Sequence, residues 1–198
     1  IGEKDFLATM HGTFWRFPKS FSKSNSAGIG PRSNYLKVIG DFCEWNGRIV
    51  FGCDDSARAE FLNTRPFKAK QGAPKQSNSN LWFIEKDRLD DLGPAIGRGS
   101  LWLKQDVVKN QTSDPFLFSG YTHKQISIHH QSKGDLPLLI EVDKKGNNQW
   151  EVMEKVLVPP HLGFFKIYDS NTSGSWLRIS TLSDAKNLTV HLRYRNKD

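Results

Sequence analysis

The sequence lacks several features that mark membrane proteins, disulfide-stabilised proteins and common enzyme families. No apolar run approaches the ~20 residues that a membrane-spanning helix needs, so we expect no membrane span. The chain has two cysteines in 198 residues, and no Cys/His cluster has the ligand spacing of a zinc site. The GxSxG, HExxH and Walker phosphate-loop motifs are missing. We therefore expect no metal and no cofactor, while an active site built from dispersed loops stays open because it leaves no local motif.

The two cysteines flank a predicted β-hairpin whose turn is Asn46-Gly47. In that register Cys43 lies opposite Val50, and Cys53 lies opposite Gly40. The thiols then sit on opposite faces of the hairpin and out of register, whereas a disulfide needs Cα atoms within roughly 7 Å. The pattern predicts no disulfide, and both residues are interpreted as small buried hydrophobes.

Acidic residues are fewer than basic ones: 21 Asp and Glu stand against 28 Lys and Arg, a net charge of +7. The cations are scattered, with one denser stretch at residues 65–75. A nucleic-acid-binding domain usually concentrates its cations on one face or helix, so this charge pattern does not favour nucleic acid as a partner. An acidic ligand such as a uronate or a sulfated glycan also fits the charge.

The C-terminal residues 113–198 show the period-2 alternation of β-strands. Ile126 and Ile128 alternate with polar residues, and so do Leu188, Val190 and Leu192. Clusters of Asp, Asn, Gly and Pro separate runs of this kind at intervals of about 8–12 residues, which is typical of an antiparallel β-sandwich.

Residues 1–92 predict aromatic-rich strands at 6–17, 38–45, 48–53 and 81–84, and no long amphipathic helix. The hairpin strands 38–45 and 48–53 are apolar on both faces, as in strands buried between stacked sheets. Blades of a β-propeller pack in this way. The predicted fold is thus all-β, with partial propeller-like blades at 1–92, a Gly-rich linker at 93–112 and an antiparallel β-sandwich at 113–198.

Three segments carry a resemblance to a known group: 35–55 (YLKVIGDFCEWNGRIVFGCDD), 77–92 (SNSNLWFIEKDRLDDL) and 113–194. Together they resemble the C-terminal part of large bacterial polysaccharide-active proteins in which a β-propeller precedes a small β-sandwich. The resemblance implies secretion, to the periplasm, the cell surface or the medium, and a polysaccharide or oligosaccharide ligand. Seven blades of ~40–45 residues need more chain than this. We therefore expect the remaining blades on the same or another polypeptide, unless the first half is not a propeller. The start at Ile1 rather than Met is what a processed or excised fragment would show.

Candidate site residues concentrate in the N-terminal region. His11 and Arg16, with Trp15 between them, combine a proton acceptor, a cation and an aromatic ring that could bind and deprotonate an acidic sugar. Asp54 ends the hairpin, where loops carry function, although a turn-capping role is the simpler interpretation. Arg32 lies in a Gly-rich loop from which it could clamp a carboxylate.

Aromatic residues provide a second group of candidates. Trp82 and Trp102 offer flat apolar faces on which a sugar ring can stack, although tryptophans of this kind are more often core residues. His123, His129 and His130 are interpreted as surface residues of the sandwich, and alternation rules out joint metal binding by the last two.

The leading hypothesis is a secreted, glycan-directed protein that binds or cleaves a polysaccharide, as a hydrolase or lyase if it is an enzyme. One alternative is a non-enzymatic carbohydrate-binding or adhesion module, and a weaker one is a basic all-β nucleic-acid-binding domain. Cleavage assays separate the first two, and a steep loss of affinity with salt on any nucleic acid identifies the third.

Overall fold

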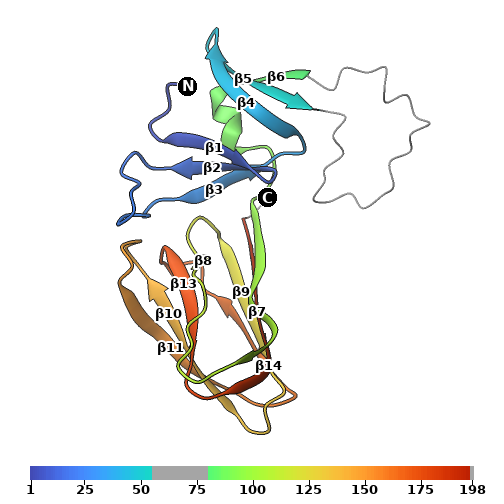
Figure 1. The fold of residues 1–198 in the computed structure, drawn as a ribbon. Helices are drawn as coiled ribbons and strands as arrows, with labels where there is room; N and C mark the ends of the chain where they lie inside the picture. Colours follow the sequence, from blue (N-terminus) through green and yellow to red (C-terminus); the bar gives the residue numbers. More distant parts are fainter. Residues whose placement is uncertain (55–79, 197–198) are drawn as a thin grey trace, which may run out of the picture.

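The computed structural model describes residues 1–54 and 80–196 and is all-β, as predicted (Figure 1). The basic stretch at 65–75 lies outside the described residues. Within them the one helical element is the 3-10 helix η2, Lys86–Asp90, and no helix is long and apolar enough to cross a membrane.

The N-terminal lobe contains β1 (Phe6–Met10), β2 (Thr13–Phe17), β3 (Gly30–Asn34), β4 (Val38–Trp45), β5 (Arg48–Asp54) and β6 (Asn80–Ile84). The C-terminal lobe contains β7 (Ile96–Val107), β8 (Phe116–Leu117), β9 (His123–His129), β10 (Leu136–Asp143), β11 (Trp150–Val158), β12 (Phe164–Tyr168), β13 (Trp176–Thr181) and β14 (Ala185–Arg195).

The N-terminal lobe consists of two three-stranded antiparallel sheets, β1-β2-β3 and β4-β5-β6, around an aromatic core. Phe14 is fully buried, and its ring centroid lies 4.5 Å from that of Tyr35 and 5.2 Å from that of Phe51. Such tilted pairs contribute about 0.5–1.5 kcal/mol beyond the burial of their area. Both sheets are open in the described part of the chain.

Two tight turns define the hairpins of this lobe. Asn46 and Gly47 have φ angles of 50° and 79°, the left-handed pair of a two-residue hairpin turn, which confirms the predicted hairpin. His11 and Gly12 have φ angles of 50° and 74°. The prediction of one strand over residues 6–17 is therefore wrong: the chain reverses at His11-Gly12 to form β1 and β2.

The cysteine register is partly as predicted. Cys43 pairs with Val50, but Cys53 pairs with Ile39 rather than Gly40 because a bulge interrupts the ladder between Ile39 and Asp41. Cys43 is exposed, so its interpretation as a buried residue is wrong, whereas Cys53 is buried. No disulfide joins the two.

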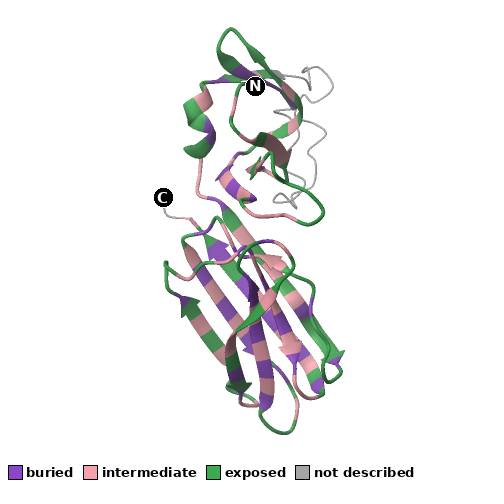
Figure 2. Ribbon diagram, turned by 90° about the vertical axis from the view of Figure 1, so that its left-hand side faces the viewer, coloured by how far each residue is buried: buried purple, intermediate pink, exposed green. Residues whose placement is uncertain are grey.

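The C-terminal lobe is a β-sandwich of two four-stranded antiparallel sheets, β11-β10-β13-β8 and β12-β9-β14-β7. Buried and exposed residues alternate along its strands (Figure 2). The inward side chains are mainly aliphatic: Ile126, Ile140 and Leu192 are all fully buried. Each buried side chain of this size contributes about 1.5–3 kcal/mol, so the alternation fixes which face of each strand packs inward.

The expected linker at 93–112 is instead largely strand. β7 occupies most of it and pairs with β14 along its length. Gly97 and Gly99, which belong to the predicted Gly-rich linker, lie under aromatic rings. A Cβ at Gly97 would lie 2.6 Å from the Tyr121 hydroxyl, and one at Gly99 would lie 2.9 Å from the Phe116 ring. Glycine within a strand here allows close packing rather than flexibility.

The two lobes contact each other through loops (Figure 1). The Ser26 N–H donates to the Gly146 carbonyl at 2.7 Å, and the Ser119 hydroxyl donates to the Ile29 carbonyl at 2.8 Å. The loop after β2 therefore lies against the β10–β11 turn of the sandwich.

Candidate functional site

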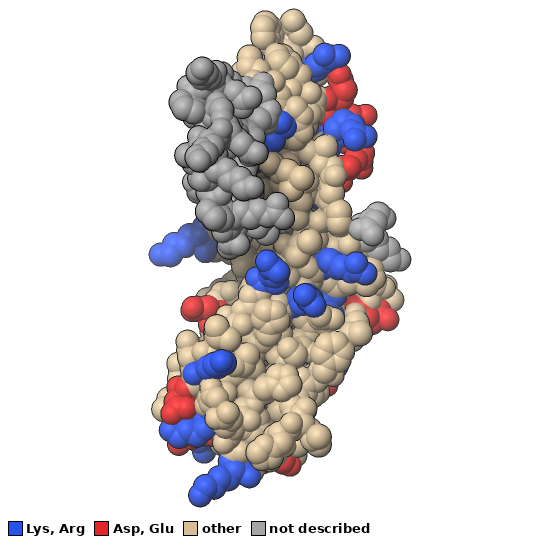
Figure 3. Space-filling view, turned by 90° about the vertical axis from the view of Figure 1, so that its right-hand side faces the viewer, with Lys and Arg blue, Asp and Glu red and all other residues tan. Residues whose placement is uncertain are grey.

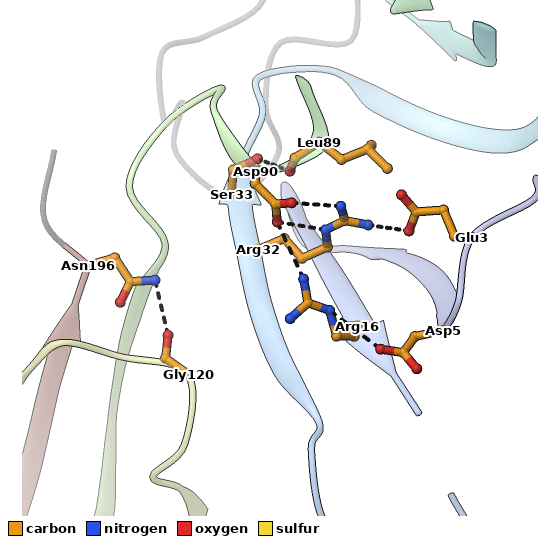
Figure 4. Close-up of polar contacts among 9 residues, drawn as sticks. All are labelled: Glu3, Asp5, Arg16, Arg32, Ser33, Leu89, Asp90, Gly120 and Asn196. Carbon is orange, nitrogen blue, oxygen red and sulfur yellow. Dashed lines mark hydrogen bonds and ion pairs between the residues drawn. The ribbon is translucent and has the colours of Figure 1, made fainter. Parts of the chain in front are cut away.

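Two predicted site arginines, Arg16 and Arg32, lie together on the N-terminal lobe because both reach Asp90 at the end of η2 (Figure 4). Arg32 donates from Nε and Nη2 to the two Asp90 oxygens, each at 2.8 Å, and its Nη1 pairs with Glu3. The Arg16 guanidinium lies 3.7 Å from both Asp5 and Asp90. Glu3, Arg32, Asp90, Arg16 and Asp5, five charged residues, thus form one continuous chain of ion pairs.

The ion-pair network occupies the N–H donors of Arg32 that a bound ligand would need. The bidentate bond from Arg32 lowers the pKa of the Asp90 carboxyl, although partial burial opposes this. The same bond with Asp90 raises the pKa of Arg32 against an opposing effect of burial, with a further contribution from Glu3. Only 7% of the Arg32 side chain is exposed. Arg32 therefore clamps carboxylates of its own chain, and this surrounding does not support its predicted role in binding a substrate carboxylate.

The other N-terminal candidates do not converge on one site. His11 lies in the exposed turn between β1 and β2, not within a strand. Trp15 and Arg16 are adjacent in β2, so their side chains point to opposite faces of the sheet. The Trp15 indole N–H donates to the Met10 carbonyl at 3.3 Å. Asp54 ends β5, but its side chain lies outside the described part of the structure.

Both predicted stacking tryptophans pack against other residues. Trp82 is half-buried, with its ring centroid 5.3 Å from that of Phe51 and 6.3 Å from that of Phe14. Trp102 is only 4% exposed and belongs to the sandwich core. The prediction of Trp102 as an exposed sugar platform is wrong because residues 96–107 form strand β7, in which a register shift opposite Val190 and His191 interrupts the alternation and this ring packs into the sandwich core.

A different cluster of basic side chains lies on the outer side of sheet β12-β9-β14-β7. Arg193 and Arg195 alternate with the buried Leu192 and Tyr194, so both project outward from β14. Arg193 pairs with Arg98 of β7, and Arg195 lies two residues further along β14. We call Arg98, Arg193 and Arg195 the arginine face. Lys and Arg side chains gather in this region of the sandwich, next to the junction of the lobes (Figure 3).

The arginine face borders a pocket with a volume of about 560 Å³. Its other lining residues come from all four strands of the sheet or their ends: Ile96, His123, Lys124, Gln125, Ile167 and Tyr194. Ile96 and Ile167 are 55% and 63% exposed and give the pocket an apolar border. The volume lies within the ~300–1,000 Å³ of typical ligand pockets.

The side chains that line this pocket carry positive charges and no negative charge. None of its lining residues is Asp or Glu, and no ion pair to Arg98, Arg193 or Arg195 is formed within the described residues. Arg98 and Arg193 face each other directly across the β7–β14 ladder. Like charges in that position destabilise a sheet unless an anion lies between them. The pocket therefore offers several guanidinium donors to an acidic ligand.

The sandwich histidines differ in their surroundings. His123 is half-buried at the pocket, with Nδ1 3.1 Å from the Thr122 hydroxyl. His129 is exposed, as predicted, whereas His130 is 6% exposed, so its interpretation as a surface residue is wrong. His130 Nε2 donates to the Val158 carbonyl at 2.9 Å while Nδ1 accepts the Ser132 N–H. Within residues 1–54 and 80–196, no group of His, Cys, Asp and Glu side chains is arranged to hold a metal ion.

Sequence reasoning missed the arginine face, although part of its signal was present. The alternation of Leu192 and Tyr194 with Arg193 and Arg195 already placed both arginines on one outward face. Arg98 could not be added to them because its strand was interpreted as a linker.

No protein-family model matches the chain, and no curated protein matches it. Among solved structures, the chain is similar to the crystal structure of SPBc2 prophage-derived protein YomS, at 9% sequence identity and a TM-score of 0.40. That similarity covers 52% of this chain and 95% of YomS.

Proposed function

We propose that this protein binds an acidic polysaccharide, carboxylated or sulfated, through the arginine face of its C-terminal sandwich. The observation that carries the proposal is the juxtaposition of Arg98, Arg193 and Arg195 beside a pocket with no acidic lining residue. Guanidinium groups match carboxylate and sulfate oxygens with paired hydrogen bonds.

The remaining lining residues fit a sugar chain better than a nucleic acid. His123 and Gln125 add side chains that hydrogen-bond hydroxyl groups. The exposed Ile96 and Ile167 offer apolar contact to the carbon faces of the sugar rings. Single-stranded nucleic-acid sites use exposed aromatic rings for base stacking, but the pocket lining contains no Trp or Phe, and its one Tyr, Tyr194, is 1% exposed.

Binding, rather than hydrolysis, is the activity that this pocket supports. Hydrolysis of a glycoside typically uses two carboxyl groups about 5–9.5 Å apart, and the lining residues contain no carboxyl group. The protein is then a carbohydrate-binding or adhesion module, or the binding part of a larger enzyme.

The resemblance to propeller-bearing proteins supports a wider form of the proposal: a secreted, glycan-directed protein whose N-terminal sheets are incomplete propeller blades. In its favour, β1-β2-β3 and β4-β5-β6 are separate antiparallel sheets that share one aromatic core. The mass of the native polypeptide tests this part: a species much larger than 22.5 kDa is expected, and a species of that mass alone contradicts it.

The binding proposal is tested by titrating the protein with polygalacturonate, heparin and chondroitin sulfate, and with neutral dextran as the control. At least one acidic polymer should bind, and its affinity should fall steeply as salt shortens the Debye length from ~10 Å at 0.1 M to ~3 Å at 1 M. Equal binding to dextran, or no binding to any acidic polymer, would contradict the proposal. Stronger binding to single- or double-stranded DNA than to every glycan would favour a nucleic-acid ligand instead. Release of reducing ends or unsaturated products would show cleavage.

A further inference from the structure

A second pocket, of about 190 Å³, lies where the loop after β2 meets the β10–β11 turn. Its lining includes Lys23 and Ser26 from the N-terminal lobe, and Asn147, Asn148, Trp150 and Trp176 from the sandwich. The volume is below the roughly 300–1,000 Å³ of pockets for drug-sized ligands. It therefore suits a ligand of about one ring rather than a polymer segment.

The two tryptophans of this pocket are fixed in place. In the sheet register Trp150 and Trp176 lie on either side of Asp143, on the outer face of β11-β10-β13-β8. The Trp176 indole N–H donates to the Ser26 hydroxyl at 2.7 Å, and the Trp150 indole N–H donates to Asn148 Oδ1 at 2.8 Å. The Arg178 guanidinium lies 4.2 Å from the Trp150 ring centroid. These contacts hold both indoles in one orientation before any ligand arrives, which lowers the entropic cost of binding.

The turn beneath the indoles is also rigid. Asp143 is 2% exposed, and its carboxylate accepts the backbone N–H groups of Lys145, Gly146, Asn147 and Asn148 at 2.7–3.3 Å. Gly146 allows the close approach of the other lobe, since a Cβ there would lie 2.5 Å from the Ala27 nitrogen. The pocket is thus built jointly by the two lobes.

Polar donors in the pocket remain available. Asn147 and Asn148 use their side-chain oxygens as acceptors, but neither Nδ2 group has a hydrogen-bond partner in the described part of the chain. Lys23 is exposed and adds an ammonium group. Two indole rings with amide and ammonium donors around them match a hexopyranose, which has an apolar C–H face and hydroxyl oxygens that accept hydrogen bonds.

We infer that this pocket is a second binding site that takes a single hexopyranose ring, separate from the arginine face. No tryptophan lines the pocket of the arginine face, so the two sites give different signals. The inference holds whether or not the arginine face binds an acidic polymer.

The test uses the indole N–H resonances of the six tryptophans in two-dimensional NMR spectra of the full chain. D-glucose, D-galactose, D-mannose and D-glucuronate are titrated separately, with Trp150→Phe and Trp176→Phe spectra to assign the two pocket signals. At least one hexose should shift the Trp150 and Trp176 signals with a millimolar Kd, as expected for a ligand of one ring, while the Trp82 and Trp102 signals stay in place.

Lys23→Ala and Asn147→Ala should each weaken this binding at least threefold, and Lys19→Ala, an exposed lysine of the same loop region, should not. Asn148 is left unchanged because its φ of 64° favours asparagine. Unchanged methyl resonances show that each variant is folded. Absence of indole shifts with all four sugars, or shifts that Lys23→Ala and Asn147→Ala leave equally strong, would overturn the inference. The inference would also be overturned if a proline-rich peptide shifted the Trp150 and Trp176 indole signals and no hexose did.

Discussion

In the N-terminal lobe Arg16, Arg32 and Arg48 each lie within 4 Å of a carboxylate, whereas in the sandwich Arg98, Arg193 and Arg195 have no such partner among the described residues. The first three are used within the protein and stabilise the approach of chain segments far apart in sequence. The last three share a sheet face with each other and no counter-charge. Identical side chains therefore serve different purposes, and the number of carboxylates nearby separates a structural arginine from one available to a ligand.

The cores of the two lobes differ as well. The N-terminal core is aromatic and includes half-buried rings such as Trp82, while the sandwich core is mainly aliphatic and encloses Trp102. Replacing Trp102 by Ala should lower the free energy of unfolding by about 3–5 kcal/mol, because a large cavity is left in a close-packed core. Trp82→Ala should cost less because that ring is partly exposed. Urea denaturation of both variants measures the difference. A Trp102→Ala variant with unchanged stability but lost glycan binding would restore the stacking role of this ring.

The paired arginines give the next largest effect. Arg32→Leu should lower the free energy of unfolding by about 2–3 kcal/mol, because Glu3 and Asp90 then lose the cation that neutralises them. This loss of stability is smaller than that expected for a fully buried ion pair because 48% of the Asp90 side chain is exposed.

Arg48→Leu is the matched control, since the Arg48–Glu85 pair is 57% exposed on both sides and should contribute no more than about 0.5 kcal/mol. Arg32→Leu should also leave binding of the acidic polymer unchanged when measured on the folded fraction. Loss of polymer binding in this variant would show that Arg32 takes part in ligand binding.

The Asp90 carboxyl gives a smaller, pH-dependent effect. Its pKa is lowered in the folded protein, chiefly by the Arg32 hydrogen bond, so its stabilising contribution is present above the unfolded pKa of about 3.9. The contribution is lost as the pH falls below that value and through the folded pKa. Asp90→Asn should therefore destabilise the protein at pH near 7, and the difference from wild type should shrink in acid.

Asp106→Asn provides the comparison for this effect, because Asp106 pairs with Lys186 at a position where both side chains are more than 60% exposed. It should change stability less than Asp90→Asn near pH 7, and the two variants should become alike in acid. Urea denaturation at neutral and acidic pH distinguishes the two variants, and equal pH profiles for both would contradict the structural role assigned to the Arg32 network.

The sequence predicted the sandwich well because alternation depends only on neighbouring residues. Ile126, Ile128, Leu188, Val190 and Leu192 were placed on the buried face from their spacing alone, and the structure confirms each of them. The Asn46-Gly47 turn was equally local. The same reasoning failed where the signal was ambiguous: Gly97 and Gly99 suggested a linker, although they are strand residues under aromatic rings.

The candidate site was harder to predict because it depends on partners distant in sequence. Arg32 pairs with Glu3 and Asp90, which are 29 and 58 residues away, and no local pattern connects them. Arg98 and Arg193 face each other only through the β7–β14 pairing. Short-range patterns can place an arginine on a surface, but they do not show whether a carboxylate lies next to it.

The central claim is tested most directly by one comparison of affinities. A variant with Arg98, Arg193 and Arg195 all changed to Gln is titrated with the acidic polymer that binds wild type best, beside a variant with Arg16 and Arg48 changed to Gln. The first should bind about 100-fold more weakly, from roughly 1 kcal/mol for each exposed arginine, and should be at least as stable because the Arg98–Arg193 repulsion is removed. The second should bind within about twofold of wild type after a small change in stability. Because the first variant loses three charges and the second loses two, the losses of affinity are compared per charge removed. Equal losses per charge in the two variants would show that net charge alone attracts the polymer and would contradict a binding site on the arginine face.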